Sequence, residues 1–278
     1  MRITQPIWER PLASPKFFLP PTTALSTNIP VSEYLDSAIE AAQAAGGLLR
    51  ANFGRPLKVD VNEAHDIKLE LDKRSQTLIE SLLLARFPGH AIYGEEGMRG
   101  DANSEYQWVI DPIDGTVNFF YGVPHFAISI ALRRDGKIIT GVIYDPMRDE
   151  LWTVEENGVP RMNGQPIAVS DRTELAEAIV SVGVAKSLDT INRGLPLFER
   201  MVRSVKKCRM MGSASLDIAY VACGRLDAYI EGQISLWDVA AGILLVERAG
   251  RTVVREPHEN AAEKYSIVAS SGRLALGV

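Results

Sequence analysis

The chain has 278 residues, 46% of them hydrophobic, and a formal net charge of −5. This length and composition predict a globular protein with a large core, in one domain or two closely packed halves. Lysine and arginine form no dense block, which argues against a nucleic-acid partner and against a polybasic membrane anchor. No stretch is long and apolar enough to cross a bilayer, and the chain starts without a signal-peptide pattern, so we expect a cytoplasmic protein.

Residues 1–30 differ in composition from the rest of the chain. They are rich in proline, including Pro20-Pro21, and carry polar runs without a hydrophobic period. This pattern predicts an irregular, proline-rich N-terminal extension. The folded body is expected to cover residues 31–278, in halves at about 31–150 and 151–278.

The first half is predicted to begin with two long amphipathic helices. Apolar residues recur at helical spacing through residues 35–53 and again through 71–86, and Pro88-Gly89 ends the second row. Four short apolar runs follow, and Asp135-Gly136 between the last two predicts a hairpin turn. The expected strands are 91–93, 108–110, 126–132 and 138–144.

The second half alternates between strand and helix patterns, which predicts helices packed against a sheet. The expected strands are 179–184, 209–211 and 228–231, and the expected helices are 195–205, 214–223 and 239–249.

Three groups of acidic residues follow a predicted strand or begin a predicted helix. They are Glu95-Glu96, Asp111 with Asp114, and Asp238. Carboxylates crowded into one turn repel one another and raise each other's pKa unless a cation neutralises them, so a divalent metal ion is expected. Oxygen ligands without His or Cys favour Mg²⁺ or Mn²⁺ over zinc.

Each acidic group also has a purely structural interpretation. Asp111 and Asp114 are compatible with an Asx-type turn, Glu95-Glu96 with a solvated loop, and Asp238 with a helix N-cap. Taken singly, the groups do not separate these interpretations from a metal site.

The three groups, taken in order, resemble the motifs of the inositol monophosphatase family. The matching segments read Gly94-Glu95-Glu96, Asp111-Pro-Ile-Asp-Gly-Thr116 and Trp237-Asp238-Val-Ala-Ala-Gly242, and the similarity covers about residues 35–278. Three separated motifs in the right order are a specific signal. The resemblance implies an α/β (α+β) fold, a layered αβαβα sandwich of the sugar phosphatase type. It also implies a magnesium-dependent, lithium-sensitive phosphomonoesterase that forms a homodimer.

The resemblance further implies a set of metal ligands. Glu95, Asp111 and the backbone carbonyl of Ile113 would hold one Mg²⁺, and Asp111, Asp114 and Asp238 would hold a second, with a third, weaker ion near Glu95. Two cations about 3.5–4 Å apart can clamp the attacking and leaving oxygens of an in-line phosphoryl displacement.

Catalytic and phosphate-binding roles follow from the same resemblance. Glu95 and Thr116 would orient and help to deprotonate the attacking water, and the N–H groups of Gly115 and Thr116 would meet the phosphate. A water near Asp238 would protonate the leaving alkoxide.

The substrate is expected to be inositol monophosphate or a similar small polyol phosphate. Glu231 matches a position that accepts hydrogen bonds from substrate hydroxyls in the inositol-hydrolysing relatives, and Ala214 supplies a nearby contact. Relatives of the same architecture act on fructose 1,6-bisphosphate, histidinol phosphate or 3′-phosphoadenosine 5′-phosphate, and the sequence leaves these alternatives open. It also leaves open a non-catalytic binding or assembly module.

One segment departs from the family pattern. Asp66-Ile-Lys-Leu-Glu-Leu-Asp72 carries Lys68 and Glu70 where many members have a small polar residue and no Lys. These added charges bear on the third metal ion and on substrate preference.

Overall fold

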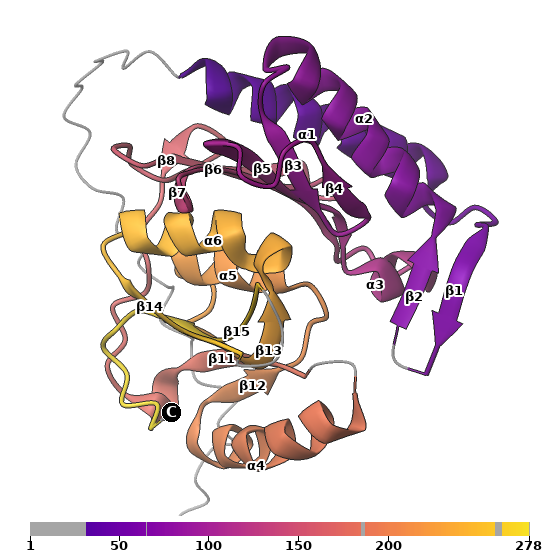
Figure 1. Ribbon diagram of the computed structural model, residues 1–278. Coiled ribbons are helices and arrows are strands. Elements are labelled where there is room, and N and C mark those ends of the chain that lie inside the picture. Colours follow the sequence, from indigo (N-terminus) through magenta and orange to yellow (C-terminus); the bar gives the residue numbers. More distant parts are fainter. Residues whose placement is uncertain (1–31, 65, 185–186, 259–262, 278) are drawn as a thin grey trace, which may run out of the picture. The chain divides into compact units, whose positions relative to one another are not determined.

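The computed structural model describes residues 32–64, 66–184, 187–258 and 263–277, which all belong to one unit, Ser32–Val278. The predicted N-terminal extension lies outside the described residues. Three helical layers and two sheets alternate through the described unit (Figure 1). This arrangement confirms the predicted αβαβα sandwich.

The first helical layer consists of α1 (Glu33–Asn52) and α2 (Glu70–Arg86), both close to their predicted bounds. The hydroxyl of Ser32 accepts a hydrogen bond from the backbone N–H of Leu35 and caps α1. The buried face of α1 is rich in alanine, and the small side chains let the helix approach the sheet closely.

The first sheet lies beneath these helices, with the strand order β10-β9-β8-β7-β6-β5-β3-β4. Its strands pair antiparallel except for β3 and β5, which run parallel. Arg134 pairs with Lys137 across Asp135 and Gly136, which both have positive φ, so the predicted hairpin turn is confirmed. The strands are β3 (Ala91–Gly94), β4 (Gly97–Arg99), β5 (Tyr106–Asp114), β6 (Ala127–Arg134), β7 (Lys137–Asp145), β8 (Glu150–Glu155), β9 (Arg161–Met162) and β10 (Gln165–Pro166).

The second sheet has the order β12-β11-β13-β15-β14 and carries α4 on its outer side (Figure 1). β11 runs parallel to both β12 and β13, whereas β15 is antiparallel to its neighbours. β14 and β15 were not predicted, and α4 begins seven residues before its predicted start. The elements are β11 (Ile179–Gly183), α4 (Leu188–Ser204), β12 (Lys207–Arg209), β13 (Ala228–Ser235), β14 (Thr252–Pro257) and β15 (Lys264–Ser270).

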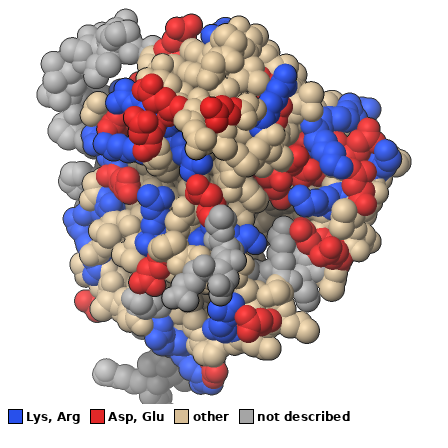
Figure 2. Space-filling view, in the orientation of Figure 1, with Lys and Arg blue, Asp and Glu red and all other residues tan. Residues whose placement is uncertain are grey.

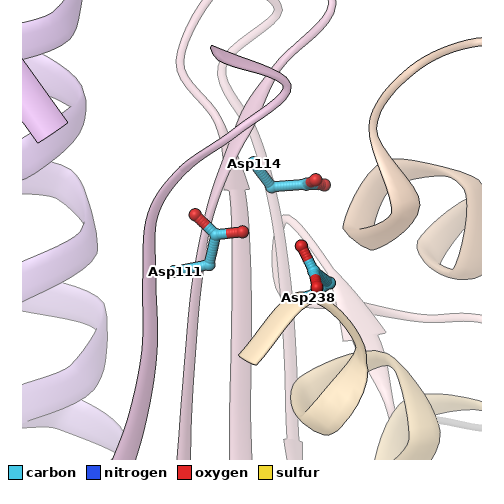
Figure 3. A group of neighbouring side chains, drawn as sticks. All are labelled: Asp111, Asp114 and Asp238. Atoms are coloured by element: carbon cyan, nitrogen blue, oxygen red, sulfur yellow. The ribbon is translucent and has the colours of Figure 1, made fainter. Parts of the chain in front are cut away.

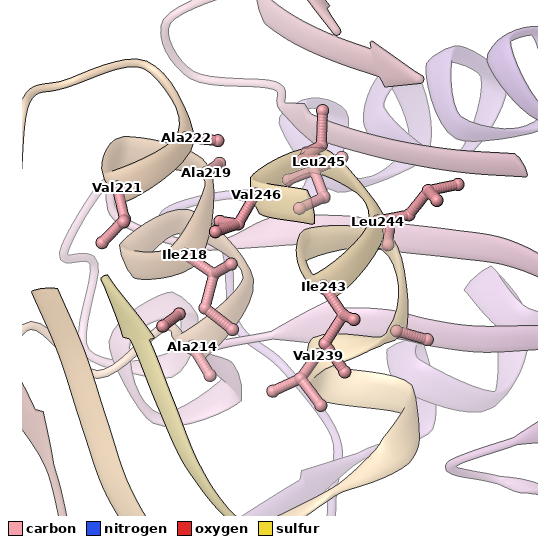
Figure 4. Close-up of a cluster of buried hydrophobic side chains, with 14 of the residues drawn as sticks. Ala214, Ile218, Ala219, Val221, Ala222, Val239, Ile243, Leu244, Leu245 and Val246 are labelled. Carbon is pink, nitrogen blue, oxygen red and sulfur yellow. The ribbon is translucent and has the colours of Figure 1, made fainter. Parts of the chain in front are cut away.

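The middle layer consists of α5 (Ala214–Ala222) and α6 (Leu236–Arg248), which lie between the two sheets. Figure 4 shows apolar side chains of both helices, among them Ile218 of α5 and Ile243 and Val246 of α6, which belong to one buried cluster. Gly242 makes the close approach possible, because a Cβ there would lie 2.5 Å from Cγ2 of Ile218. The contact fixes the N-termini of both helices at the same edge of the first sheet.

Three short elements border the same edge, and all three were missed. β1 (Val59–Glu63) and β2 (Asp66–Leu69) form a separate antiparallel hairpin, and the short helix α3 (Thr116–Phe120) packs against β2. On the face drawn in Figure 2, Lys and Arg side chains are interspersed with Asp and Glu side chains. Within the described residues, no helix is long and apolar enough to cross a membrane.

We expect Gly242→Ala to lower the free energy of unfolding by about 1–2 kcal/mol, because overpacking against Ile218 outweighs the gain in helix propensity. Gly47→Ala in α1 is the matched control: no atom lies within 4 Å of its added Cβ, and stability should rise by up to about 1 kcal/mol. Urea unfolding of both variants measures the difference. A Gly242→Ala protein as stable as the control would contradict the close packing of α5 and α6.

Candidate active site

A cleft of ≈ 660 Å³ lies between the end of β5, the β3–β4 turn, the helices α5 and α6, and the strand β13. Every residue that the sequence assigned to the site lines it. These residues are Glu95, Asp111, Ile113, Asp114, Gly115, Thr116, Ala214, Glu231 and Asp238.

Three carboxylates converge in this cleft, from segments more than a hundred residues apart. Asp111 and Asp114 lie at the end of β5, and Asp238 lies in the first turn of α6 (Figure 3). One carboxylate oxygen from each residue lies within 4.8 Å of the other two. The predicted meeting of these groups is therefore present in the fold.

An irregularity in β5 brings Asp111 and Asp114 to the same side of the sheet. Asp111 pairs with Ser129 and Asp114 with Ala127, so the segment around Pro112 holds one residue more than its partner strand. Proline has no N–H to donate to the ladder, which makes this the natural place for a bulge. The N–H of Ile113 donates to Oδ1 of Asp111 at 3.0 Å, so the Asx-type turn is also present.

Asp111 is buried close to other acidic side chains. Burial is the main reason that its pKa lies well above its usual range, and the nearby charges of Glu95 and Asp114 raise the pKa further. The group would therefore gain from any cation that binds in the cleft.

Asp114 is held by the start of α5. Its Oδ2 accepts hydrogen bonds from the hydroxyl of Ser213 at 2.6 Å and from the N–H of Ser215 at 2.7 Å, and the N–H of Ala214 donates to Oδ1 at 3.3 Å. Burial raises the pKa of Asp114, although these hydrogen bonds oppose the rise. The sequence analysis did not identify this positioning role of Ser213 and Ser215.

Asp238 occupies the third position of α6, and Ser235 is the N-cap, so the N-cap interpretation of Asp238 is wrong. Its Oδ2 accepts the N–H of Ser235 at 3.1 Å, and its carbonyl accepts the hydroxyl of Ser215 at 2.8 Å. The second contact ties α6 to the helix that holds Asp114.

Glu95 lies in the turn between β3 and β4, lines the same cleft and acts electrostatically on Asp111, although it is not in the group of three aspartates within 4.8 Å. Its N–H donates to the carbonyl of Ile110, one residue before Asp111. The turn is thus fastened to β5, and the solvated-loop interpretation does not describe Glu95, whose side chain is only 15% exposed.

Asp72 was not among the predicted site residues, although it touches the site directly. Its Oδ1 accepts the hydroxyl of Thr116 at 3.1 Å, and its Oδ2 accepts the N–H of Leu69 at 2.8 Å. Burial raises its pKa to about 7, with Glu95 and Glu96 adding to the rise. An Asp at the third position of a helix was the signal that pointed to such a capping contact.

The residues present fit a divalent cation. The convergent donors are all carboxylate oxygens, two of the three aspartates are buried, and mutual repulsion raises the pKa of Asp111. Oxygen-only sites of this kind suit magnesium or manganese, and a bound ion would relieve the repulsion.

Glu231 lines the cleft on the side of the second sheet. It lies within β13, just before a bulge, and not at the end of a strand as expected. The hydroxyl of Tyr229 donates to Oε2 of Glu231. Gly183 of β11 faces the same carboxylate, and a side chain there would collide with it. The orientation of this acceptor is therefore set by its two neighbours.

Asp217 is a second buried acid that the sequence did not single out. It lines the cleft from α5, its Oδ2 accepts the hydroxyl of Ser181 at 2.6 Å, and its Oδ1 has no hydrogen-bond partner among the described residues. Burial raises its pKa to about 8, and the charges of Asp114 and Glu231 contribute.

Comparison with known proteins identifies the relatives of this chain. The model of the inositol monophosphatase family matches residues 31–277. A Nus factor SuhB of Pseudomonas aeruginosa is 40% identical over 79% of this chain and 84% of its own length, and an inositol-1-monophosphatase of Mesorhizobium japonicum is 38% identical over the same shares. The crystal structure of the extragenic suppressor protein SuhB from Bartonella henselae superposes with a TM-score of 0.80 at 33% identity, over 87% of this chain and 95% of that one.

We expect Asp217→Asn to flatten the pH dependence of stability in metal-free protein. With a folded pKa of about 8 against 3.8 unfolded, wild-type Asp217 keeps its proton only in the folded state, so stability falls as pH rises through 8. Between pH 6 and 9 the free energy of unfolding should therefore fall by about 2–3 kcal/mol less in the variant than in the wild type.

Urea unfolding at several pH values, with chelator present, measures this slope. The exposed change Asp101→Asn serves as the control and should reproduce the wild-type curve. Parallel curves for Asp217→Asn and wild type would contradict a protonated Asp217 in the fold.

Proposed function

Because the chain belongs to the inositol monophosphatase family, we propose that its cleft hydrolyses a small phosphomonoester with bound magnesium ions, on a polyol such as inositol monophosphate. Family membership supports a phosphatase of this superfamily, and the substrate is our proposal. The observation that carries it is the convergence of Asp111, Asp114 and Asp238 within 4.8 Å in a cleft that also contains Glu231.

We assign the metal ligands as the family motifs suggest. Glu95, Asp111 and the carbonyl of Ile113 would hold one ion, and Asp111, Asp114 and Asp238 the other. When bound, the ions would neutralise the carboxylates, acidify the attacking water and offset negative charge on the phosphate. The carbonyl of Ile113 already accepts the hydroxyl of Thr116 at 2.9 Å and keeps a second lone pair for an ion.

Thr116 and Glu95 would orient the attacking water. The hydroxyl of Thr116 has one hydrogen, which it gives to Asp72 or to the carbonyl of Ile113, so its oxygen is left as an acceptor for water. The attacking water would donate one hydrogen bond to Thr116. Ionised Glu95 carries no proton, so it would accept the second proton of the water as the water attacks. Asp72 acts here as a positioning residue, because it sets the direction of the Thr116 hydroxyl.

Gly115 makes the sharp turn from β5 into α3. It has a φ of 98°, and a Cβ there would lie 3.1 Å from the carbonyl oxygens of Gly212 and His125. Any side chain would be strained at this position. We propose that the N–H groups of Gly115 and Thr116 meet the phosphate at this turn.

We propose four broader features: that residues 31–278 form the phosphatase domain, that the protein acts in the cytoplasm, that it forms a homodimer, and that lithium inhibits its activity. The family match over residues 31–277 supports the domain, and the resemblance to the family supports the homodimer and the lithium sensitivity.

A second candidate function comes from the P. aeruginosa relative, which is named a Nus factor. In this alternative the chain serves as an assembly module, and its cleft binds ions without turnover.

We predict that the purified chain releases phosphate in the presence of Mg²⁺ and stops when a chelator is added. A panel of inositol monophosphate, fructose 1,6-bisphosphate, histidinol phosphate and 3′-phosphoadenosine 5′-phosphate should identify the substrate.

Asp111→Asn should lower kcat by about three orders of magnitude or more, on the order of 4 kcal/mol, because both ions lose a shared ligand.

Circular dichroism should confirm that Asp111→Asn remains folded. Release that persists in chelator would contradict the metal mechanism. Magnesium binding without release from any substrate of the panel would favour the assembly module.

Substrate recognition is tested by Glu231→Gln. The change replaces one hydrogen-bond acceptor by a donor, so kcat/KM for inositol monophosphate should fall, mainly through a higher KM. The fall should correspond to a loss of roughly 1.5–3 kcal/mol of binding free energy. An aryl phosphate offers no hydroxyls to Glu231, and its hydrolysis should change little. Equal losses on both substrates, or none, would contradict the assignment of Glu231 to polyol hydroxyls.

A further inference from the structure

Lys68 places a positive charge at one end of the acidic cleft. It lies on β2, and its side chain lines the cleft together with Glu95, Asp111 and Asp238. Its Nζ lies 3.0 Å from Oε1 of Glu96 and 3.8 Å from Oε1 of Glu95. The cation of Lys68 therefore bridges two adjacent carboxylates, one of which we assign to a metal ion.

The side chains of this bridge are largely shielded from solvent. The side chain of Lys68 is 34% exposed, and those of Glu96 and Glu95 are 6% and 15% exposed. Charges that are largely withdrawn from water act on one another more strongly than exposed charges, because less solvent screens them. Two other lysine–carboxylate pairs of this region, Lys58 with Glu70 and Lys73 with Asp60, lie outside the cleft, and their lysines are more exposed, at 72% and 57%.

The position of Lys68 is fixed by two paired elements. β2 pairs with β1, with Val61 opposite Lys68, and Leu69 donates to Asp72 of α2. On the other side of the bridge, the N–H of Glu96 donates to Oε1 of Gln76 at 2.9 Å. Lysine and glutamate thus approach from two anchored segments.

We propose that Lys68 is a fixed cation that competes with divalent ions for the Glu95 end of the cleft. This inference rests on the proposed metal site. A positive charge this close repels a divalent cation and offsets part of the negative charge that would attract one. A divalent ion at the Glu95 end of the cleft would therefore bind less tightly than the carboxylates alone would allow, and we expect it to be the weakest bound ion of this chain.

The test is a titration of substrate-free protein with Mn²⁺ at pH 7.5. Binding is measured by calorimetry or from the electron paramagnetic resonance signal of unbound Mn²⁺. In Lys68→Met the dissociation constant of the weakest bound ion should fall tenfold or more. Lys68→Gln, which can still donate a hydrogen bond to Glu96, should show the same direction of change. Lys68→Arg keeps the charge and should bind as the wild type does.

Lys137→Met is the matched control, since it also removes a lysine from an ion pair, with Glu156, and neither residue lines the cleft, so its Mn²⁺ binding should not change. Equal or weaker Mn²⁺ binding in both neutral Lys68 variants would overturn the inference and leave the metal site standing. A wild-type chain that binds no Mn²⁺ would instead overturn the metal site, and the inference with it.

Discussion

Repulsion among buried carboxylates is the constraint that shapes this cleft. Asp111 has lost nearly all contact with water, and its pKa is raised by burial and by the acids around it. Such a group destabilises the metal-free fold whenever it is ionised. The surrounding structure therefore has to supply hydrogen-bond donors and positive charge, and it does so differently for each acid.

The two halves of the chain share this task. Asp114 comes from the first sheet but is held by Ser213 and Ser215 of α5, while Ser215 also binds the carbonyl of Asp238. α5 and α6 can hold both aspartates only because Gly242 lets them pack closely. Packing in the middle layer and ligand geometry in the cleft therefore depend on the same contact.

The sequence was sufficient to predict the layers and the convergence of the acidic groups. Helical periodicity marked α1 and α2, and the three motifs located Glu95, Asp111, Asp114 and Asp238, which all line the cleft. Some of the missed elements have weak local patterns: four of the five residues of β1 are exposed, and β14 is mostly exposed at a sheet edge. Such strands are specified by their pairing partners more than by their own periodicity.

The missed site residues share a different cause. Ser213 and Asp217 act through side-chain contacts with residues far away in sequence, as in the hydrogen bond from Ser213 to Asp114, and no local spacing reveals such contacts. Asp72 carried the local signal of a helix start, but its contact with Thr116 also joins distant parts of the chain. Glu231 was found by motif, but its place within β13 was not, because a bulge depends on the register with β15.

The proposed metal ligands and the proposed substrate contact lie on different layers of the sandwich. The proposed ion ligands lie on β5, in the β3–β4 turn and at the start of α6, whereas Glu231, Tyr229 and Gly183 lie on the second sheet. A substitution at Gly183 would displace the carboxylate of Glu231 without touching an ion ligand. This separation gives a physical reason why chains of one fold can keep the metal-dependent chemistry and differ in the phosphomonoester that they accept.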